Sequence, residues 1–217
     1  MGLKVRIIPS LLLKNGRLVK GRAMRDHRDA GHPVTTVRAL CAQGADEILL
    51  LDIAEDAPHW DVLEAVADEC TVPLAFGGGL ESRDDVALAF RHGADKVFVP
   101  IEKRALVEDT IFRCGRQAVI VGVDVRRDGA LRGVEGCEHR LLSVAAEGSR
   151  RGLDTALAAW SYGPLILEGG AGTLAHIRDA FRAGVNAVAL GTMLVFSDCN
   201  IVKIKKYLKQ EGIPVRL

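Results

Sequence analysis

The sequence predicts a single (β/α)₈ barrel over residues 1–217, built from two half-barrels at about 1–115 and 116–217. Eight short apolar, β-branched segments alternate with helical patterns, which is typical of βα units. These segments are apolar almost throughout, as at 47–53, which indicates parallel strands covered on their outer face. The sequence also repeats itself at an offset of 91 residues, which places Gly78-Gly79 on Gly169-Gly170. Two equal halves favour a closed barrel over a doubly wound sheet.

The expected elements follow in order along the chain. Strands are predicted where apolar and β-branched residues run together, at 5–13, 47–53, 73–77, 95–99, 118–124, 138–144, 164–168 and 187–191. Helices are predicted where apolar residues recur at a spacing of three and four, at 34–42, 60–70, 83–92, 106–114, 153–160, 174–183 and 200–210. The connection between Asp124 and Glu138 is glycine-rich and too short for a crossover helix, so the fifth helix is predicted to be short or missing.

Composition narrows the class of protein. With 217 residues, 48% of them hydrophobic and 26% charged, the chain resembles a globular domain and not a disordered segment. A formal net charge of +1 argues against a nucleic-acid surface. No long apolar run and no signal peptide is recognisable, which favours a cytoplasmic protein that has no membrane span. Five widely spaced cysteines fit reduced thiols, and neither a metal site nor a cofactor is expected.

Glycine clusters follow three strands at their carboxyl ends, where barrels carry their chemistry. The clusters are Gly77-Gly78-Gly79 after the third strand, Gly169-Gly170-Ala171-Gly172 after the seventh and Gly191-Thr192 after the eighth. Backbone N–H groups of such glycines can approach an anion closely, and loops after strands seven and eight form a recurrent phosphate site in barrels. A helix that starts near Thr173 would add its positive dipole end. The alternative is that these glycines only permit tight turns.

Two aspartates end predicted strands among apolar neighbours. Asp124 closes the fifth strand and Asp52 the second. A partly buried carboxyl at this position can have its pKa raised and act as a general acid or base. The alternative for each is a carboxylate that accepts hydrogen bonds from loop amides.

Charged residues also stand at the opposite, amino-terminal ends of four apolar strands. They are Arg6, Glu47, Lys96 and Glu138, and Glu47 and Glu138 are equivalent in the repeat. If the four side chains point inward, two cations and two anions could form a salt-bridged ring across the barrel floor. The residue types alone favour the alternative, solvated strand ends that face outward.

Six motifs together resemble the cyclase subunit of imidazole glycerol phosphate synthase, over essentially the whole chain. They are RIIPSLLLKNGRLVKG at 6–21, GADEILLLDI at 44–53, FGGGL at 76–80, GADKV at 93–97, VGVD at 121–124 and EGGAG at 168–172. The first motif is most similar to a paralogous group found with surface-polysaccharide genes, where a glutaminase and a barrel are associated with converting an acetamido sugar to an acetamidino sugar.

The resemblance implies an ammonia-using synthase. A glutaminase subunit would dock on the amino-terminal face, and ammonia would pass through the barrel to a substrate held by its phosphates at the top. In the family, an Arg, a Glu, a Lys and a Glu form a ring that acts as a gate for ammonia at the amino-terminal end of the barrel. These residues match Arg6, Glu47, Lys96 and Glu138 one by one, which favours the ring. Its catalytic positions are kept at Asp124 and Lys20. From strand ends, glycine clusters and resemblance together, the expected substrate-binding and phosphate-binding residues are Gly78, Gly79, Asp52, Glu147, Gly148, Gly169, Gly170, Gly191 and Thr192.

The top face departs from the family at three places. The family's first-strand catalytic aspartate is Leu12, which cannot transfer a proton. Pro100-Ile101 replace an Asn-Thr pair, which removes two side-chain donors to a phosphate, and Glu147 replaces an aspartate. These departures favour an amidotransferase synthase subunit of the acetamido-to-acetamidino type, acting on a phosphorylated or nucleotide-sugar acceptor. The alternatives are the cyclase subunit of histidine biosynthesis, and a non-catalytic barrel that binds and activates a glutaminase.

Overall fold

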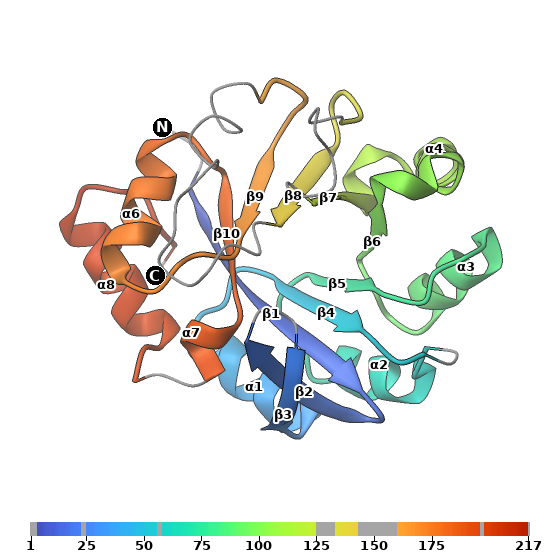
Figure 1. Cartoon of the computed structure of the whole chain (residues 1–217), viewed down its shortest axis with the longest axis horizontal. Coiled ribbons are helices and arrows are strands. Elements are labelled where there is room, and N and C mark those ends of the chain that lie inside the picture. The colour runs from blue at the N-terminus through green and yellow to red at the C-terminus, as the bar shows by residue number, and fades with distance from the viewer. Residues whose placement is uncertain are drawn as a thin grey trace.

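The computed structural model describes residues 4–22, 25–55, 58–124, 133–142, 160–195 and 198–216. Over these residues, a closed barrel of parallel strands forms the centre and helices surround it (Figure 1). The last strand pairs with its predecessor and also with the first strand, which closes the barrel. The barrel strands are β1 (Arg6–Lys14), β4 (Ile48–Asp52), β5 (Leu74–Gly77), β6 (Lys96–Pro100), β7 (Val119–Asp124), β8 (Glu138–Leu142), β9 (Leu165–Glu168) and β10 (Ala187–Leu190). The predicted barrel is confirmed.

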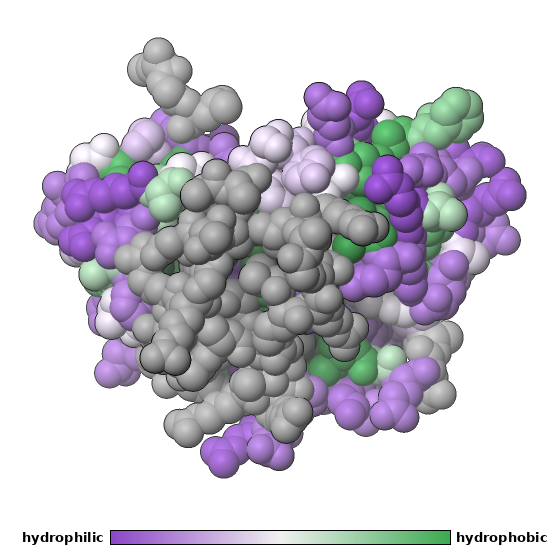
Figure 2. Space-filling model, turned by 45° about the horizontal axis from the view of Figure 1, so that its top comes forward, coloured by the Kyte–Doolittle hydropathy of each residue, from purple (hydrophilic) through white to green (hydrophobic). Residues whose placement is uncertain are grey.

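Helices cover the outer face of the barrel. The longer ones are α1 (Pro33–Ala42), α2 (Trp60–Ala67), α3 (Arg83–Arg91), α4 (Arg104–Cys114), α6 (Leu174–Arg182) and α8 (Ile201–Gln210), with short turns η1 (Ile101–Lys103), η2 (Arg116–Ala118) and α7 (Thr192–Val195). Figure 2 shows mostly hydrophilic side chains on the two flanks of one face, as expected for helices that turn their apolar side to the barrel. None of the helices described is long and apolar enough to cross a membrane.

The six longer helices match predicted ones, and the remaining predicted helix cannot be compared. Apart from Trp160, which is not helical, the segment 153–160 lies outside the described residues. The same holds for 125–132, where the fifth helix was predicted to be short or missing. The described end of that connection, 133–137, contains a turn and a bend and no helix.

A β-hairpin that the sequence reading missed extends the sheet beyond β1. Its strands β2 (Arg17–Arg22) and β3 (Arg25–Gly31) run antiparallel, and β2 pairs with the end of β1. Asn15 and Gly16 form the turn between β1 and β2, with positive φ values of 52° and 72°. An Asn-Gly pair is the preferred two-residue hairpin turn because both positions need positive φ. The hairpin places Lys20 on β2, next to the carboxyl-terminal end of β1.

Two apolar layers explain why the barrel strands are hydrophobic throughout. Along β1, Ile8 and Leu12 belong to a cluster inside the barrel, whereas Ile7, Leu11 and Leu13 belong to the larger core between barrel and helices. Alternate residues of a strand face opposite sides, so each strand supplies both layers.

The two halves of the barrel make the same contacts at equivalent positions. Leu74 N donates to the Asp95 side chain at 2.8 Å, and 91 residues later Leu165 N donates to the Asn186 side chain at 2.8 Å. Further equivalent pairs are the helix N-caps Ser82 and Thr173 and the glycines Gly93 and Gly184, with φ values of 95° and 97°. The sequence repeat is therefore also a structural one.

His139 anchors the described end of the short connection to β8. Its Nε2 accepts from Val134 N at 2.9 Å and its Nδ1 donates to Cys137 O at 2.9 Å. The ring is fully buried and lies edge-on to Trp160, with 4.8 Å between centroids. Burial lowers the pKa of His139 to about 4, because the proton acceptor Nε2 has no access to water.

This histidine should make the fold sensitive to mild acid. Its pKa is near 6.5 in the unfolded chain, which therefore binds more protons than the folded chain between pH 6.5 and pH 4. Stability from His139 is fully present above pH 6.5 and falls by about 2 kcal/mol between pH 7 and pH 5. Urea unfolding at both pH values checks this. A His139→Gln variant should lack this part of the pH dependence, and an unchanged slope in the variant would contradict the assignment.

Candidate active site and amino-terminal ring

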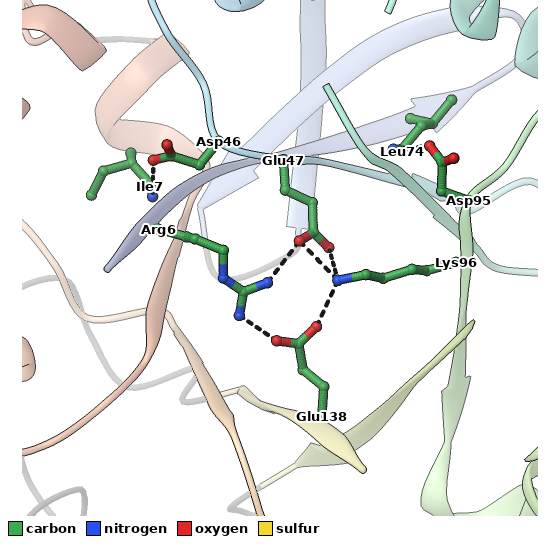
Figure 3. Close-up of polar contacts among 8 residues, drawn as sticks. All are labelled: Arg6, Ile7, Asp46, Glu47, Leu74, Asp95, Lys96 and Glu138. Carbon is green, nitrogen blue, oxygen red and sulfur yellow. Dashed lines mark hydrogen bonds and ion pairs between the residues drawn. The ribbon is translucent and has the colours of Figure 1, made fainter. Parts of the chain in front are cut away.

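Four charged side chains meet at the amino-terminal end of the barrel (Figure 3). Arg6 Nη1 donates to Glu47 at 2.8 Å and its Nη2 bonds Glu138. Lys96 Nζ donates to Glu47 at 3.0 Å and to Glu138 at 2.9 Å. Each cation therefore contacts both carboxylates, which makes a closed ring from β1, the start of β4, β6 and β8. The ring is confirmed as a structure, and the alternative of solvated, outward-facing strand ends is wrong.

The ring is largely withdrawn from water, most completely at Glu47, whose side chain is 2% exposed. Burial, helped by the charge of Glu138, raises the pKa of Glu47 in spite of the neighbouring cations. Burial also disfavours the Glu138 carboxylate, but the hydrogen bond from Arg6 and the charge of Lys96 outweigh it and lower its pKa. Removing one cation would leave two buried carboxylates to share the single remaining cation.

A carboxylate next to the ring, Asp46, connects the elements that supply the ring residues. Asp46 accepts from Ile7 N at 2.9 Å and from Lys205 Nζ at 2.8 Å, which joins β4 to β1 and to α8. Below the ring, a hollow of about 210 Å³ opens at the amino-terminal face. It is lined by Lys4, Val5, Arg6, Asp46, Glu47, Pro73, Lys96 and Arg216.

The predicted glycines lie at the carboxyl ends of the strands, as expected for a barrel. Gly169 and Gly170 follow β9 with φ values of 95° and 72°, a conformation that favours glycine, and α6 begins after the N-cap Thr173. Gly191 follows β10, and a Cβ there would lie 2.1 Å from Lys20 Nζ. Thr192 begins the short helix α7. The ammonium group of Lys20 thus lies directly over the loop that was predicted to bind phosphate.

Gly78 and Asp52 pack tightly together at the end of β4. Asp52 accepts from Ala54 N at 3.0 Å and His59 N at 2.8 Å, and lies 2.9 Å from His59 Nδ1. These contacts match the loop-capping alternative for Asp52. Gly79 lies against Pro58, where a Cβ would approach to 2.8 Å. Binding of substrate by these three residues stays a prediction.

Replacing Gly78 by Ala should destabilise the fold far more than replacing Gly184. Both glycines have positive φ, 94° and 97°, so an alanine is strained equally at both, by about 1–2 kcal/mol. A Cβ on Gly78 would lie 1.7 Å from Asp52 O, whereas nothing lies within 4 Å of one on Gly184. The clash should add about 1–3 kcal/mol or more. Equal unfolding free energies of the two variants would contradict this close packing.

The other top-face positions that the sequence singled out differ in how polar and how buried they are. Asp124 is the last residue of β7 and is half-buried. Leu12 is 1% exposed and belongs to the apolar cluster inside the barrel, so β1 presents no proton donor there. Pro100 ends β6 and Ile101 begins η1. Glu147 and Gly148 lie outside the described residues.

Sequence reasoning missed a buried polar cluster inside the barrel. Glu168 accepts from Ser10 Oγ at 2.9 Å and is bonded by Arg140 Nε. Burial disfavours its charged form, but the charge and hydrogen bond of Arg140 outweigh burial and lower the pKa of Glu168. The signal in the sequence was a single arginine within the strand 138–142. Among the residues that the structure describes, no three His, Cys, Asp or Glu side chains gather as a metal site.

Comparisons with known proteins agree with this architecture. A family model described as histidine biosynthesis protein matches residues 6–141. The imidazole glycerol phosphate synthase subunit HisF of Streptomyces griseus is 36% identical over 251 aligned positions, which cover 100% of both chains. The proteins of the same name from Wolinella succinogenes and Methanosphaerula palustris are each 34% identical, covering 98% and 100% of both chains respectively. This chain belongs to the histidine biosynthesis protein family, together with these HisF subunits.

Proposed function

We propose that this chain is the ammonia-accepting synthase subunit of a glutamine amidotransferase. A glutaminase subunit docks on the amino-terminal face, and its ammonia enters the barrel through the ring of Arg6, Glu47, Lys96 and Glu138. The observation that carries this proposal is the closed ring across the barrel floor. Burying ion pairs seldom adds stability over apolar side chains, so four of them at the barrel floor favour a functional role.

The ring has the properties of a gate. Lys96 is one of two links between Glu47 and Glu138, at 3.0 Å and 2.9 Å, and its flexible side chain can swing aside without breaking the Arg6 contacts. The hollow beneath the ring gives a docked partner access to both cations. Binding of the glutaminase would displace Lys96 and open the floor to a neutral molecule as small as ammonia.

The acceptor would bind at the opposite end, where strand-end glycines face the loops. The N–H groups of Gly169, Gly170 and Gly191, with Thr192, would hold a phosphate, and Lys20 Nζ would add its charge beside Gly191. Asp124 would transfer protons as general acid or base at the end of β7. Its half-buried place at a strand end suits that role. The remaining predicted contacts, Gly78, Gly79, Asp52, Glu147 and Gly148, would complete the binding face.

Two reactions are candidates for the top face. The names of the relatives favour formation of imidazole glycerol phosphate. The buried Leu12 and the Pro100-Ile101 pair favour amidination, because a site with one carboxylate fewer suits a reaction without the cyclase's second proton transfer. In amidination, ammonia adds to the carbon of an activated acetamido group, and the carbonyl oxygen leaves with its activating group.

Turnover with ammonium chloride separates the two. The purified chain would be given either the ribulosyl imidazole-carboxamide substrate of the cyclase or an activated acetamido sugar nucleotide. Turnover of the first at about 1 s⁻¹ or more would assign the cyclase reaction, and turnover of the second alone would assign amidination. The proposal as a whole fails if neither acceptor reacts and the chain neither binds nor stimulates a glutaminase.

A further inference from the structure

Directly above the ring, an arginine lies over an aromatic ring inside the barrel. Arg140 lies two residues after Glu138 on β8, and Phe98 two residues after Lys96 on β6. Residues two apart on a strand face the same side, so both side chains point into the barrel above the ring. The Arg140 guanidinium carbon lies 4.9 Å from the centre of the Phe98 ring.

Small residues make room for this pair. A Cβ on Gly77 would lie 2.7 Å from Phe98 Cβ, and one on Gly122 would lie 2.3 Å from Phe98 Cζ. Gly77 pairs with Phe98 across β5 and β6, and Gly122 pairs with Arg140 across β7 and β8. The strands on both sides of the aromatic ring therefore lack side chains at this level, and Phe98 and Arg140 take up that space.

Arg140 is held in place by a hydrogen bond from its Nε, but its Nη2 group is unused as a donor among the described residues. Its side chain is 4% exposed, its Nε bonds Glu168, and Glu168 is fixed in turn by Ser10 Oγ at 2.9 Å. Among the described residues, Arg140 Nη2 is buried and has no hydrogen-bond partner. Buried donors are almost always satisfied, so an exception on the inside of a barrel points to a ligand that accepts a hydrogen bond.

The chemistry of this donor discriminates between the two forms of ammonia. Neutral ammonia carries a lone pair that can accept a hydrogen bond from Nη2. Ammonium, like a lysine head group, has donors only, and it would be repelled by a guanidinium that stays charged at all working pH values. Glu168, the carboxylate bonded by Arg140, is already paired with Arg140 and Ser10 and also interacts with the charge of Lys20.

We propose that Arg140 Nη2 is a binding site for neutral ammonia, one step above the ring, that excludes ammonium. The site deepens the proposed function and rests on it for the source of ammonia. It gives a role to a buried arginine in a barrel interior that also holds an apolar cluster. Ammonia leaving the ring would pause at Nη2 beside Phe98 before it reaches Asp124 and the acceptor.

Carbon-detected NMR of the full chain, labelled with ¹³C,¹⁵N-arginine, tests the site without any acceptor or glutaminase. The Arg140 signals are assigned by their loss in Arg140→Lys. Ammonium chloride is added in equal amounts at pH 7 and pH 9, with tetramethylammonium chloride as a matched salt that has no lone pair. We expect the Arg140 signals to move with ammonium chloride, several-fold more at pH 9 where more of it is neutral, and to stay in place with tetramethylammonium.

Equal shifts at both pH values, equal shifts with both salts, or no shift would overturn the ammonia site. Each of these outcomes is independent of the proposed function, because the assay contains no partner and no acceptor. Conversely, a selective shift in a chain that fails to bind a glutaminase would support the site and leave the proposed function to fail separately.

A second measurement follows the same site in the coupled reaction. In the double variant Arg140→Leu with Glu168→Gln, no buried carboxylate loses its partner, so the fold should survive. We expect its glutamine-driven turnover to fall about tenfold, as for one lost hydrogen bond to ammonia, and its ammonium-driven turnover to fall less, because ammonia from solution need not pass the ring and Arg140 to reach the acceptor. Parallel losses with both nitrogen sources would overturn a site on the route between the ring and the acceptor.

Discussion

Asp124→Asn should lower ammonia-dependent turnover by about 10²–10⁴-fold, the range for removing a general acid or base. Asp124 ends β7 half-buried at the top of the barrel, and the equivalent end of β1 carries Leu12, which is 1% exposed and cannot replace it. The change keeps the shape of the side chain and removes only its proton-transfer ability. Steady-state rates with ammonium chloride as nitrogen source measure the effect.

The matched control is Asp109→Asn, the same chemical change on the outer helix α4, where Asp109 pairs with Arg113 in solvent. That variant should keep its turnover and lose less than about 1 kcal/mol of stability. Binding of the glutaminase should be unchanged in both variants. If Asp124→Asn also kept full turnover, Asp124 would have no catalytic role. If the chain were a non-catalytic barrel, neither the parent protein nor the two variants would show ammonia-dependent turnover.

Lys96→Met should weaken the ring and destabilise the fold. It removes one of the two cations that contact Glu47, whose side chain is 2% exposed, and leaves Glu47 and Glu138 to share Arg6, which should cost up to about 3–5 kcal/mol of unfolding free energy. Adding Glu47→Gln should recover part of the loss, because one of the two carboxylates that share Arg6 is then gone. Urea unfolding of the two variants measures both effects. No recovery in the double variant would argue against a coupled ring.

The ring variant should also release glutamine-derived ammonia to solvent. Lys205→Met provides the comparison, because Lys205 forms a pair with Asp46 at 2.8 Å outside the ring, and this lysine is more buried than Lys96. Both variants should be destabilised, but only Lys96→Met should separate glutamine hydrolysis from product formation. If the ratio of product formed to glutamine hydrolysed were the same in both variants, the ring would contribute to stability and would not act as a gate.

Much of the fold was predictable because two apolar layers make each barrel strand stand out. The segment 48–52 is buried at every position, so its hydrophobic run could only be an inner strand. The β2–β3 hairpin was harder, because Arg17–Arg22 and Arg25–Gly31 carry many charges and lack that pattern. The only signal nearby was the Asn15-Gly16 pair, which forms the turn between β1 and β2.

The candidate site was predictable only where a family pattern supplied the pairing. Arg6 and Glu138 are 132 residues apart, and their residue types alone favoured solvent-facing strand ends. The resemblance to a known floor gate reversed that choice. Arg140 and Glu168 had no such pattern behind them, and a lone charge in a short strand does not reveal which way it points. Their pairing required the closed barrel itself.

Isotope transfer tests the central claim most directly. The chain and its glutaminase would be given amide-¹⁵N-glutamine and an acceptor that the ammonium assay has identified, with excess unlabelled ammonium chloride in solution. A synthase subunit that receives ammonia through its barrel should form product carrying mostly ¹⁵N, in wild type and in Lys205→Met but not in Lys96→Met. Product labelled only in proportion to the mixed ammonia pool, in the wild-type pair, would contradict passage through the ring.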